Sequence, residues 1–326
     1  MNVLVTGGAG YIGSVVVEHL TERGHRAVAF DNLSRGHREA VAPGASLVVG
    51  DLRDGDALVA AIREHEIEAV IHMAASSLVG ESVIDPHAYF NNNVVGGISL
   101  LDAMLTTGVR RLVFSSTCAV YGEPATVPIT EDLPLQPVNA YGETKLIFER
   151  TLKWYEAAYG LRYISLRYFN AAGATERCGE DHSPETHIIP IVLDVARGRR
   201  SHVDILGEDY ATPDGTCIRD YIHVSDLAEA HLVSLLALEK GSRIFNLGYG
   251  AGYSVQEVVE MARQVTGRQI LTEGAPRRPG DPPILIASAD RAMSELGWQP
   301  RHSELDVIIQ SAWRWHEEHP EGYGPA

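Results

Sequence analysis

The sequence predicts an α/β protein built on a Rossmann-type, doubly wound parallel sheet, followed by a smaller C-terminal α/β domain. In the first half, short apolar runs alternate with segments of helical periodicity, a pattern typical of a parallel sheet with helices on both faces. A glycine-rich turn follows the first apolar run, at residues 7–13. Beyond residue 170 the alternation gives way to loops rich in Gly, Pro, Asp and Glu.

The elements are expected in a regular order along the chain. The expected strands are nearly continuous in apolar residues, which fits a sheet buried on both faces, and they lie at residues 3–6, 27–30, 46–49, 69–72, 112–115 and 163–167. Helical periodicity predicts helices over residues 12–23, 55–64, 86–106, 140–158, 254–266 and 303–316. Loops are expected at residues 171–184, 207–215 and 277–283.

The change of pattern predicts a domain boundary at residue 170. Residues 1–170 are expected to form the cofactor-binding sheet domain, and residues 171–326 a substrate-binding domain that closes over it. Residues 221–238 are expected to pack back on the first domain.

Composition limits the classes of partner. The formal net charge is −16, which argues against a general nucleic-acid binder because phosphate binding depends on basic surface. Three widely spaced cysteines (Cys118, Cys178 and Cys217) with no CxxC pair argue against a disulfide scaffold or a zinc knuckle and predict a cytoplasmic protein. No signal peptide, membrane span or metal site is expected.

The glycines at positions 7, 10 and 13 predict a dinucleotide site. They lie between a strand and a helix, where glycine permits a tight turn and the helix N-terminus can hold a pyrophosphate. A second strand ends in Asp31, 31 − 13 = 18 residues past Gly13 and close to the usual spacing of about 20. A carboxylate there accepts from ribose hydroxyls and repels a 2′-phosphate, so NAD is favoured over NADP. Arg35 is the one feature that favours NADP.

Two later strand ends are predicted to line the same site. Asp51 and Leu52 follow the third strand, and the small residues Met73, Ala74 and Ala75 follow the fourth. Ligands bind at the carboxyl ends of the strands in open α/β sheets, so these residues are expected near the adenine edge and along the cofactor.

Tyr141 and Lys145 form the predicted catalytic pair. Their i, i+4 spacing near a helix start, with Asn139 as the expected cap, puts both side chains on one face. A free tyrosine has a pKa of about 10, and a nearby ammonium and nicotinamide cation would favour the phenolate. The run Ser115-Ser116-Thr117 ends the preceding strand and offers a hydroxyl that can relay a proton.

Taken together, these motifs resemble those of the UDP-glucose 4-epimerases of the extended short-chain dehydrogenase/reductase class. The likeness runs from residue 2 to about residue 320. The motifs that carry it are the glycine turn, Ser115–Thr117, the YxxxK pair, Arg167–Asn170 and residues 79–83, 91–94, 215–224 and 277–281.

The resemblance implies epimerisation at sugar C4 with a resident cofactor. Tyr141 is expected to remove the 4-hydroxyl proton, with Lys145 and Thr117 beside it, while NAD takes hydride from C4 and returns it to the other face of a transient 4-keto sugar. The implied cofactor-binding residues are Gly7, Gly10, Tyr11, Ile12, Gly13, Asp31, Asn32, Asp51, Leu52, Met73, Ala74, Ala75, Asn93, Ser115, Tyr141, Lys145, Tyr168 and Phe169.

The implied substrate is a UDP-sugar, and the implied assembly is a homodimer formed by helices near residues 90–107 and 140–158. Arg219 and Arg278 resemble diphosphate ligands, since a guanidinium can hold phosphate oxygens in pairs. The full implied substrate set is Thr117, Tyr141, Asn170, His187, Ile188, Leu206, Arg219, Arg278, Asp281 and Leu285.

Three departures from the family pattern matter. Thr117 stands where many members carry serine and keeps the hydroxyl, whereas His187 stands where some carry asparagine. Leu285 stands where some members carry tyrosine and leaves room for an N-acetyl group, so activity on UDP-N-acetylglucosamine and UDP-N-acetylgalactosamine is an open expectation.

Other functions stay open at this point. A 4,6-dehydratase would carry an Asp-Glu pair directly after the strand-end threonine, where this chain has Cys118 and Ala119. An epimerase for UDP-uronic acids or UDP-pentoses is poorly separated by sequence. A catalytically silent NAD-binding scaffold would not need Tyr141, Lys145 and Thr117 together.

Overall fold

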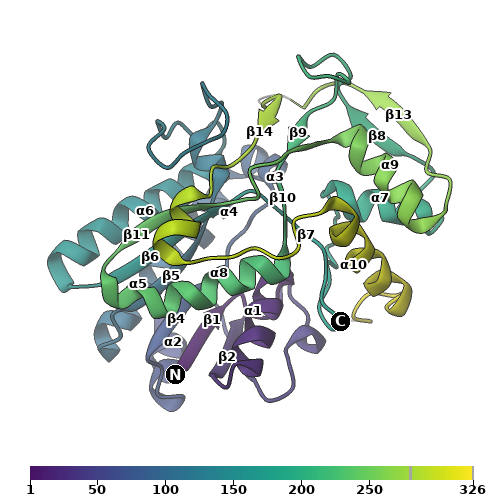
Figure 1. The fold of residues 1–326 in the computed structure, drawn as a ribbon. Helices are drawn as coiled ribbons and strands as arrows, with labels where there is room; N and C mark the ends of the chain where they lie inside the picture. Colours follow the sequence, from purple (N-terminus) through teal and green to yellow (C-terminus); the bar gives the residue numbers. More distant parts are fainter. Residues whose placement is uncertain (279–280, 325–326) are drawn as a thin grey trace.

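The computed structural model describes residues 1–278 and 281–324, and its centre is a seven-stranded parallel sheet. The strand order is β11-β6-β5-β4-β1-β2-β3, which confirms the predicted doubly wound arrangement (Figure 1). The strands are β1 (Asn2–Thr6), β2 (Arg26–Asp31), β3 (Ser46–Val49), β4 (Ala69–His72), β5 (Arg111–Thr117), β6 (Arg162–Tyr168) and β11 (Arg243–Leu247).

The outermost strand β11 was not predicted. It pairs in parallel with β6, with Phe245 beside Leu166, although some 75 residues separate the two strands in the chain. The strand is short and carries the polar Asn246, which is buried: its amide accepts from the Tyr121 hydroxyl (2.7 Å) and donates to the Ile129 carbonyl (2.9 Å). A buried asparagine interrupts the apolar run by which a central strand is recognised.

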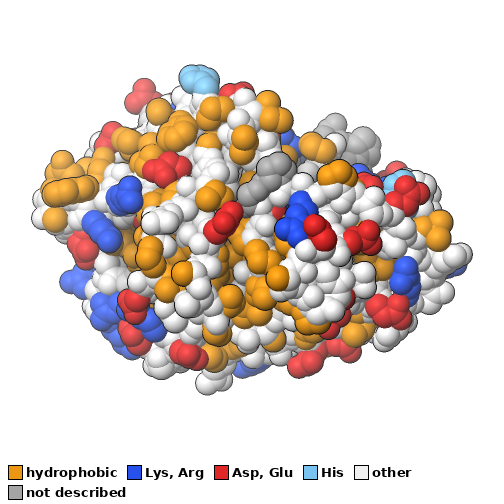
Figure 2. Space-filling model, turned by 90° about the horizontal axis from the view of Figure 1, so that it is seen from above, with side chains coloured by type: hydrophobic (Ala, Val, Ile, Leu, Met, Phe, Trp, Pro, Cys, Tyr) orange, Lys and Arg blue, Asp and Glu red, His pale blue; other side chains and the backbone are white. Residues whose placement is uncertain are grey.

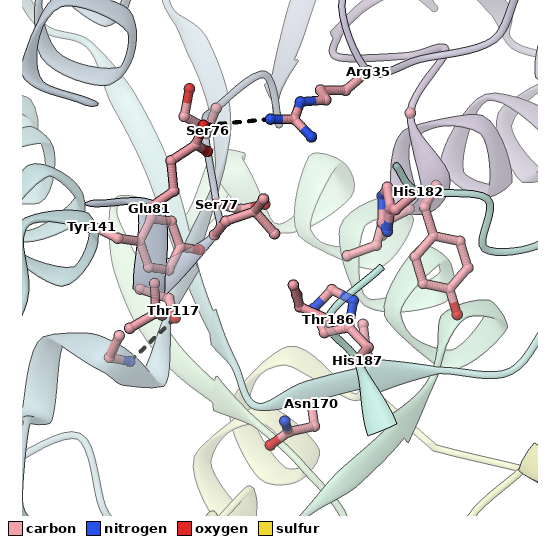
Figure 3. A pocket seen from close by; sticks show the side chains of 18 of the residues that line it. Arg35, Ser76, Ser77, Glu81, Thr117, Tyr141, Asn170, His182, Thr186 and His187 are labelled. Carbon is pink, nitrogen blue, oxygen red and sulfur yellow. Dashed lines mark hydrogen bonds and ion pairs between the residues drawn. The ribbon is translucent and has the colours of Figure 1, made fainter. Parts of the chain in front are cut away.

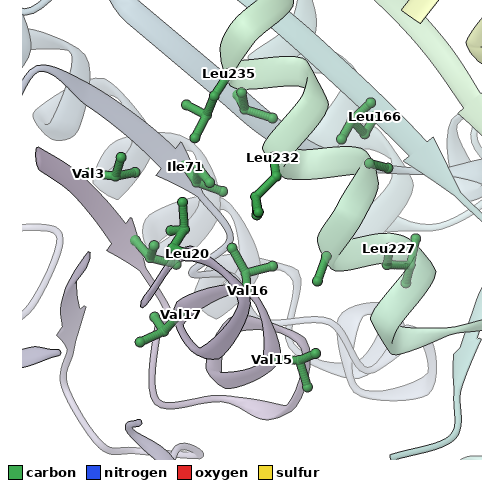
Figure 4. Packing of buried hydrophobic residues seen from close by; sticks show 14 of the residues in the cluster. Val3, Val15, Val16, Val17, Leu20, Ile71, Leu166, Leu227, Leu232 and Leu235 are labelled. Carbon is green, nitrogen blue, oxygen red and sulfur yellow. The ribbon is translucent and has the colours of Figure 1, made fainter. Parts of the chain in front are cut away.

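Helices cover both faces of the sheet. One face packs against α1 (Tyr11–Glu22) and α8 (Val224–Ala237), and the other against α2 (Gly55–Glu64), α5 (Gly96–Thr107) and α6 (Ala140–Tyr159). Alternate residues of β1 divide between two cores, because successive side chains of a strand point to opposite faces. Val3 and Val5 join the α1–α8 core, which Figure 4 shows, and Leu4 joins the other.

The helix predicted over residues 86–106 is instead a chain of three helical pieces. They are α4 (Pro86–Tyr89), a π-helical turn η2 (Phe90–Val95) and α5, with a short α3 (Val79–Ile84) before them. Asn93 lies inside the π turn, and its amide donates to the Ser76 carbonyl and to the Thr144 hydroxyl, both at 3.0 Å. The wider turn lets a helical residue bind across to a neighbouring loop, a common role of π-helical insertions.

A second group of elements lies beyond the carboxyl ends of the strands, on the right in Figure 1. A separate apolar core joins α7 (Ile188–Ala196), α9 (Val255–Thr266), α10 (Leu305–Glu318) and β8 (Val203–Leu206). The smaller pieces are η1 (Arg38–Ala40), η3 (Cys118–Tyr121), β7 (Asn170–Ala172), β9 (Ile218–Arg219), β10 (Tyr221–His223), η4 (Leu238–Lys240), β12 (Tyr253–Ser254), β13 (Thr272–Ala275), β14 (Ile284–Leu285) and η5 (Ala292–Leu296).

The second half of the chain returns to the sheet twice, through α8 against α1 and through β11 against β6. Two polypeptide halves therefore share the sheet core, and a division of the chain into domains at residue 170 stays a prediction.

The surface carries mixed charge. Lysine and arginine side chains lie among aspartate and glutamate on the face shown in Figure 2. Among the described residues, no helix is both long enough and apolar enough to cross a membrane.

Candidate active site

A cavity of about 750 Å³ lies over the carboxyl ends of β1, β4, β5 and β6, between the sheet and the smaller core. Its volume suits a small organic ligand. The predicted cofactor residues that line it are Gly7, Gly10, Tyr11, Ile12, Gly13, Asp31, Asn32, Leu52, Met73, Ala74, Ala75, Tyr141, Lys145, Tyr168 and Phe169. The predicted substrate residues Thr117, Asn170, His187, Ile188, Leu206, Arg219, Arg278, Asp281 and Leu285 line it as well.

The glycine turn fits a dinucleotide because side chains have no room there. Gly7 has φ +72, and a Cβ on it would lie 2.7 Å from the Ala74 nitrogen, while a Cβ on Gly13 would collide with the Gly7 carbonyl. Helix α1 starts after Gly10 with no side-chain cap and no acid in its first turn. Its first N–H groups are thus open toward the cavity, which is the arrangement that holds a pyrophosphate.

Asp31 ends β2 inside the cavity, where NAD selectivity would be decided. Its carboxylate accepts from the backbone N–H of Ala9 (3.0 Å) and of Leu33 (2.9 Å), and burial raises its pKa. Arg35 does not turn toward it: the guanidinium donates to the Ser183 carbonyl (2.7 Å) and pairs with Glu81 (3.5 Å; Figure 3). The feature that favoured NADP in the sequence is therefore engaged elsewhere.

The predicted catalytic residues converge on one wall. Thr117 is the last residue of β5, and Tyr141 lies in the first turn of α6, which Asn139 caps by accepting from the Gly142 N–H (2.8 Å). Figure 3 shows the Tyr141 ring next to Thr117. Lys145 lies one turn farther along α6, with Nζ 5.9 Å from the centre of the Tyr141 ring.

The electrostatics of this wall favour a neutral phenol in the protein alone. Burial raises the pKa of Tyr141, against which the Thr117 hydroxyl acts in the lowering direction. Burial also lowers the pKa of Lys145 to about 7, although Glu149 acts in the raising direction. The lysine donates to the Ser115 carbonyl (2.8 Å) and is nine-tenths buried. A further cation next to the phenol is needed to favour the phenolate, and the nicotinamide ring of NAD is such a cation.

The opposite wall carries the predicted substrate residues. Asn170 begins β7, and His187 precedes α7, whose first turn has no acid and no side-chain cap. Arg219, nearly buried in β9, pairs with Asp281 at 2.6 Å. Pro279 and Gly280, in the loop between Arg278 and Asp281, lie outside the described residues.

Three residues predicted for the cofactor do not line the cavity. Asp51 is held by two hydrogen bonds from Arg53 (both 2.7 Å), which keep the pKa of its carboxyl well below the usual range. Asn93 supports the Ser76 loop from behind. Ser115 is fully buried, and its hydroxyl bonds to His231 at 2.8 Å.

Other lining residues were missed by sequence reasoning. Glu180 and His182 lie in the segment expected to be an unstructured loop, and Tyr89, whose hydroxyl donates to the Leu78 carbonyl (2.7 Å), lies in the interrupted helix. The available signal was the alternation of acids and histidines in residues 180–187, which is unusual for a plain loop.

Comparison with known proteins gives a consistent result. The model of the NAD dependent epimerase/dehydratase family matches residues 3–248. The UDP-glucose 4-epimerase of Halalkalibacterium halodurans is 54% identical over 327 residues, which cover 99% of this chain and 98% of that protein.

Solved structures are similar along the whole chain. A crystal structure of a UDP-glucose 4-epimerase is 50% identical, with a TM-score of 0.97 and all of both chains covered. The UDP-glucose 4-epimerase of Brucella ovis, solved with NAD, is 48% identical with a TM-score of 0.93, covering 96% of this chain and 97% of that one.

Proposed function

We propose that this chain, which belongs to the NAD dependent epimerase/dehydratase family, is an NAD-dependent isomerase that interconverts UDP-galactose and UDP-glucose. The observation that carries the proposal is the placement of Tyr141 and Thr117 side by side on one wall of the cavity, with Lys145 one helical turn away. When bound, NAD supplies the hydride acceptor and donor for sugar C4 and is regenerated in each cycle.

The residues of the chain perform the proton chemistry and the positioning. Tyr141 takes the proton of the sugar 4-hydroxyl, and Thr117 holds that hydroxyl in line with the phenol. Lys145 donates to the Ser115 carbonyl (2.8 Å), which holds its ammonium at the base of the cavity. Desolvation of this wall keeps water away from a reactive carbonyl.

The opposite wall is suited to hold the nucleotide. The open first turn of α7 and the guanidinium groups of Arg219 and Arg278 meet the two negative phosphates. Asp281 pairs with Arg219 Nη2 at 2.6 Å, and Arg219 Nη1 donates to the Ile218 carbonyl (2.8 Å), so these two contacts orient the guanidinium and its remaining N–H groups would serve phosphate oxygens. Leu206 contributes an apolar flank for the uracil, and Asn170 faces the sugar.

Turnover of UDP-galactose without added NAD tests the proposal, with UDP-glucose detected by a coupled dehydrogenase. Tyr141→Phe is expected to lower kcat by about 10²- to 10⁴-fold, because it removes the proton acceptor and little else. Tyr159→Phe is the matched control, since Tyr159 ends the same helix and is 54% exposed. Equal turnover by the two variants would contradict the role of Tyr141 as proton acceptor, whereas no turnover of any UDP-sugar by folded parent enzyme would favour a scaffold. No product from folded, NAD-loaded enzyme would redirect the search to UDP-uronic acids and UDP-pentoses.

The proposed substrate range includes the N-acetylated UDP-sugars. Leu285 lies in β14 on the cavity wall beside Arg219 of β9, where a larger side chain would narrow the space for the sugar. Leu285→Tyr is expected to abolish turnover of UDP-N-acetylglucosamine and to spare that of UDP-galactose. If the parent enzyme turns over only UDP-galactose under the same conditions, this extension is wrong.

We further propose that the chain forms a homodimer through α5, α6 and the turn before them. Val95 and Trp154 are 52% and 76% exposed there, so both side chains are free to pack against a second copy of the chain. Light scattering should give twice the mass of the chain, and Trp154→Glu should give monomers. Leu236→Glu, at a site 64% exposed on α8, should leave the mass unchanged. A monomeric parent would refute the interface.

The free state of all three cysteines fits the proposed cytoplasmic location.

A further inference from the structure

Two histidines and two glutamates form a cluster on the cavity wall that faces Tyr141. Glu180, His182 and Glu185 come from the segment between β7 and α7, and His187 directly precedes α7. Figure 3 shows His182 and His187 on the side of the cavity away from Tyr141. Of the four residues, only His187 is among the substrate residues predicted from the sequence.

Each of the four residues offers one ligand atom, and these atoms all lie within 4.8 Å of one another. His187 Nδ1 lies 2.6 Å from Glu180 Oε1 and 3.3 Å from Glu185 Oε1. His182 Nδ1 lies 3.2 Å from Glu180 Oε1 and 3.8 Å from Glu185 Oε2. In a tetrahedral zinc site with bonds of about 2.0–2.1 Å, neighbouring donor atoms are about 3.3–3.4 Å apart. The distances of 2.6–3.8 Å between the atoms named here bracket that value, so modest side-chain rotations would bring the four ligand atoms to zinc-ligand spacing.

The deepest ligand atoms lack hydrogen bonds. Within residues 1–278 and 281–324, neither Glu180 Oε1 nor His182 Nδ1 has a hydrogen-bond partner, and both atoms are buried. The Glu180 side chain is only 5% exposed. His187 Nδ1 and His182 Nδ1 lie 2.6 and 3.2 Å from Glu180 Oε1, within ion-pair distance, although this oxygen accepts no hydrogen bond from the described residues. A buried carboxylate oxygen without a hydrogen bond is costly, and a bound cation is one way to satisfy it.

We propose that Glu180, His182, Glu185 and His187 bind one divalent transition-metal ion of the zinc class. Two imidazoles and two carboxylates make a neutral complex with a dication, and imidazole nitrogen selects Zn²⁺ and its neighbours over Mg²⁺ and Ca²⁺. In the sequence the ligands have the spacing Glu-x-His-x-x-Glu-x-His. This pattern contains no cysteine and differs from a zinc knuckle.

The test measures metal binding by the full-length, NAD-loaded enzyme. Zn²⁺ is titrated in competition with a chromophoric chelator, and Co²⁺ is added to a second sample to record the visible absorption of tetrahedral cobalt. The expected result is one ion per chain and a tetrahedral cobalt spectrum. His182→Gln should weaken Zn²⁺ binding by about tenfold or more and remove the spectrum.

His202→Gln provides the matched control. His202 also lies beside two acids, Asp204 at 3.4 Å and Glu273 at 3.6 Å. Among the described residues, however, His202 belongs to no group of side chains whose atoms could together hold a metal ion. The His202→Gln variant should bind Zn²⁺ with the same affinity as the parent enzyme and give the same cobalt spectrum. Glu185→Gln serves as a second variant if His182→Gln unfolds, and retained NAD absorbance with an unchanged Tm establishes folding in either. The proposed site would be overturned if the parent enzyme bound Zn²⁺ no more tightly than folded His182→Gln or Glu185→Gln does. An equal loss of Zn²⁺ affinity in His202→Gln would also overturn it.

Discussion

The proposed proton transfer depends on a single atom of Thr117, its hydroxyl oxygen. The side chain is buried at the end of β5, where its oxygen accepts from the Ala119 N–H (3.1 Å) and lies next to the Tyr141 ring. Threonine differs there from serine only by a methyl group, which stiffens χ1 and leaves the hydroxyl in place.

Replacing Thr117 therefore separates shape from chemistry. Thr117→Val keeps the volume and removes the hydroxyl, so kcat for UDP-galactose should fall by about 10²- to 10⁴-fold. Thr117→Ser should restore most of the rate. Steady-state kinetics on both variants is the check, and a valine enzyme within a few-fold of the parent would show that Tyr141 needs no hydroxyl partner.

At the scale of single residues, the sequence predicts the position of a side chain when that position depends only on the spacing between neighbouring residues. Tyr141 and Lys145 share a helix face, and the glycines at positions 7 and 13 are fixed by a single turn, so both sets lie in the cavity as expected. Ser115 and Asn93 lie in the expected motifs but point into the protein, because the partners that turn them, His231 and Thr144, come from distant segments. No local pattern contains that information.

At the scale of elements, α8 shows how a buried polar contact joins two parts of the chain. His231 of α8 bonds through Nδ1 to the Leu227 carbonyl (2.7 Å), which requires a proton on that nitrogen. Its Nε2 then accepts from the Ser115 hydroxyl of β5 (2.8 Å). Burial lowers the pKa of this ring to about 4, so it stays neutral in the folded protein at ordinary pH.

The neutral ring makes stability depend on pH in a defined window. Between pH 6.5 and about 4 the unfolded chain binds a proton at His231 that the folded protein does not bind, so its stabilising contribution is complete above pH 6.5 and is lost as the pH falls. His231→Gln should flatten the slope by about 1.4 kcal/mol per pH unit in that window. Urea unfolding at pH 7 and pH 5 measures it, with exposed His87→Gln as the control. Parallel slopes in parent and His231→Gln would disprove the assignment.

The elements that sequence reasoning missed have physical causes in common. β11 carries a buried asparagine, η2 widens a helix so that Asn93 can reach another loop, and α7 is only nine residues long. In each case tertiary contacts decide the local structure and override the periodic pattern. The long strands and helices around the glycine turn, where pattern and packing agree, lie within a few residues of their predicted bounds.

At the scale of the whole molecule, the sheet supplies one wall of the cavity and the smaller core the other. Two contacts bridge them beyond the cofactor site: Arg35 donates to the Ser183 carbonyl (2.7 Å), and His37 bonds to the Asp181 carbonyl (3.0 Å). The loop after β2 is thereby tied to the segment before α7, beside the cavity.

This bridge separates the time a cofactor stays from the time a reaction takes. The two contacts oppose separation of the walls between which a dinucleotide would lie, so its residence time should depend on how often the walls separate rather than on the rate of turnover. Each chain would then keep one NAD molecule through many catalytic cycles. Cellular NAD would determine how soon a newly made chain becomes active, and would have little influence on its rate afterwards.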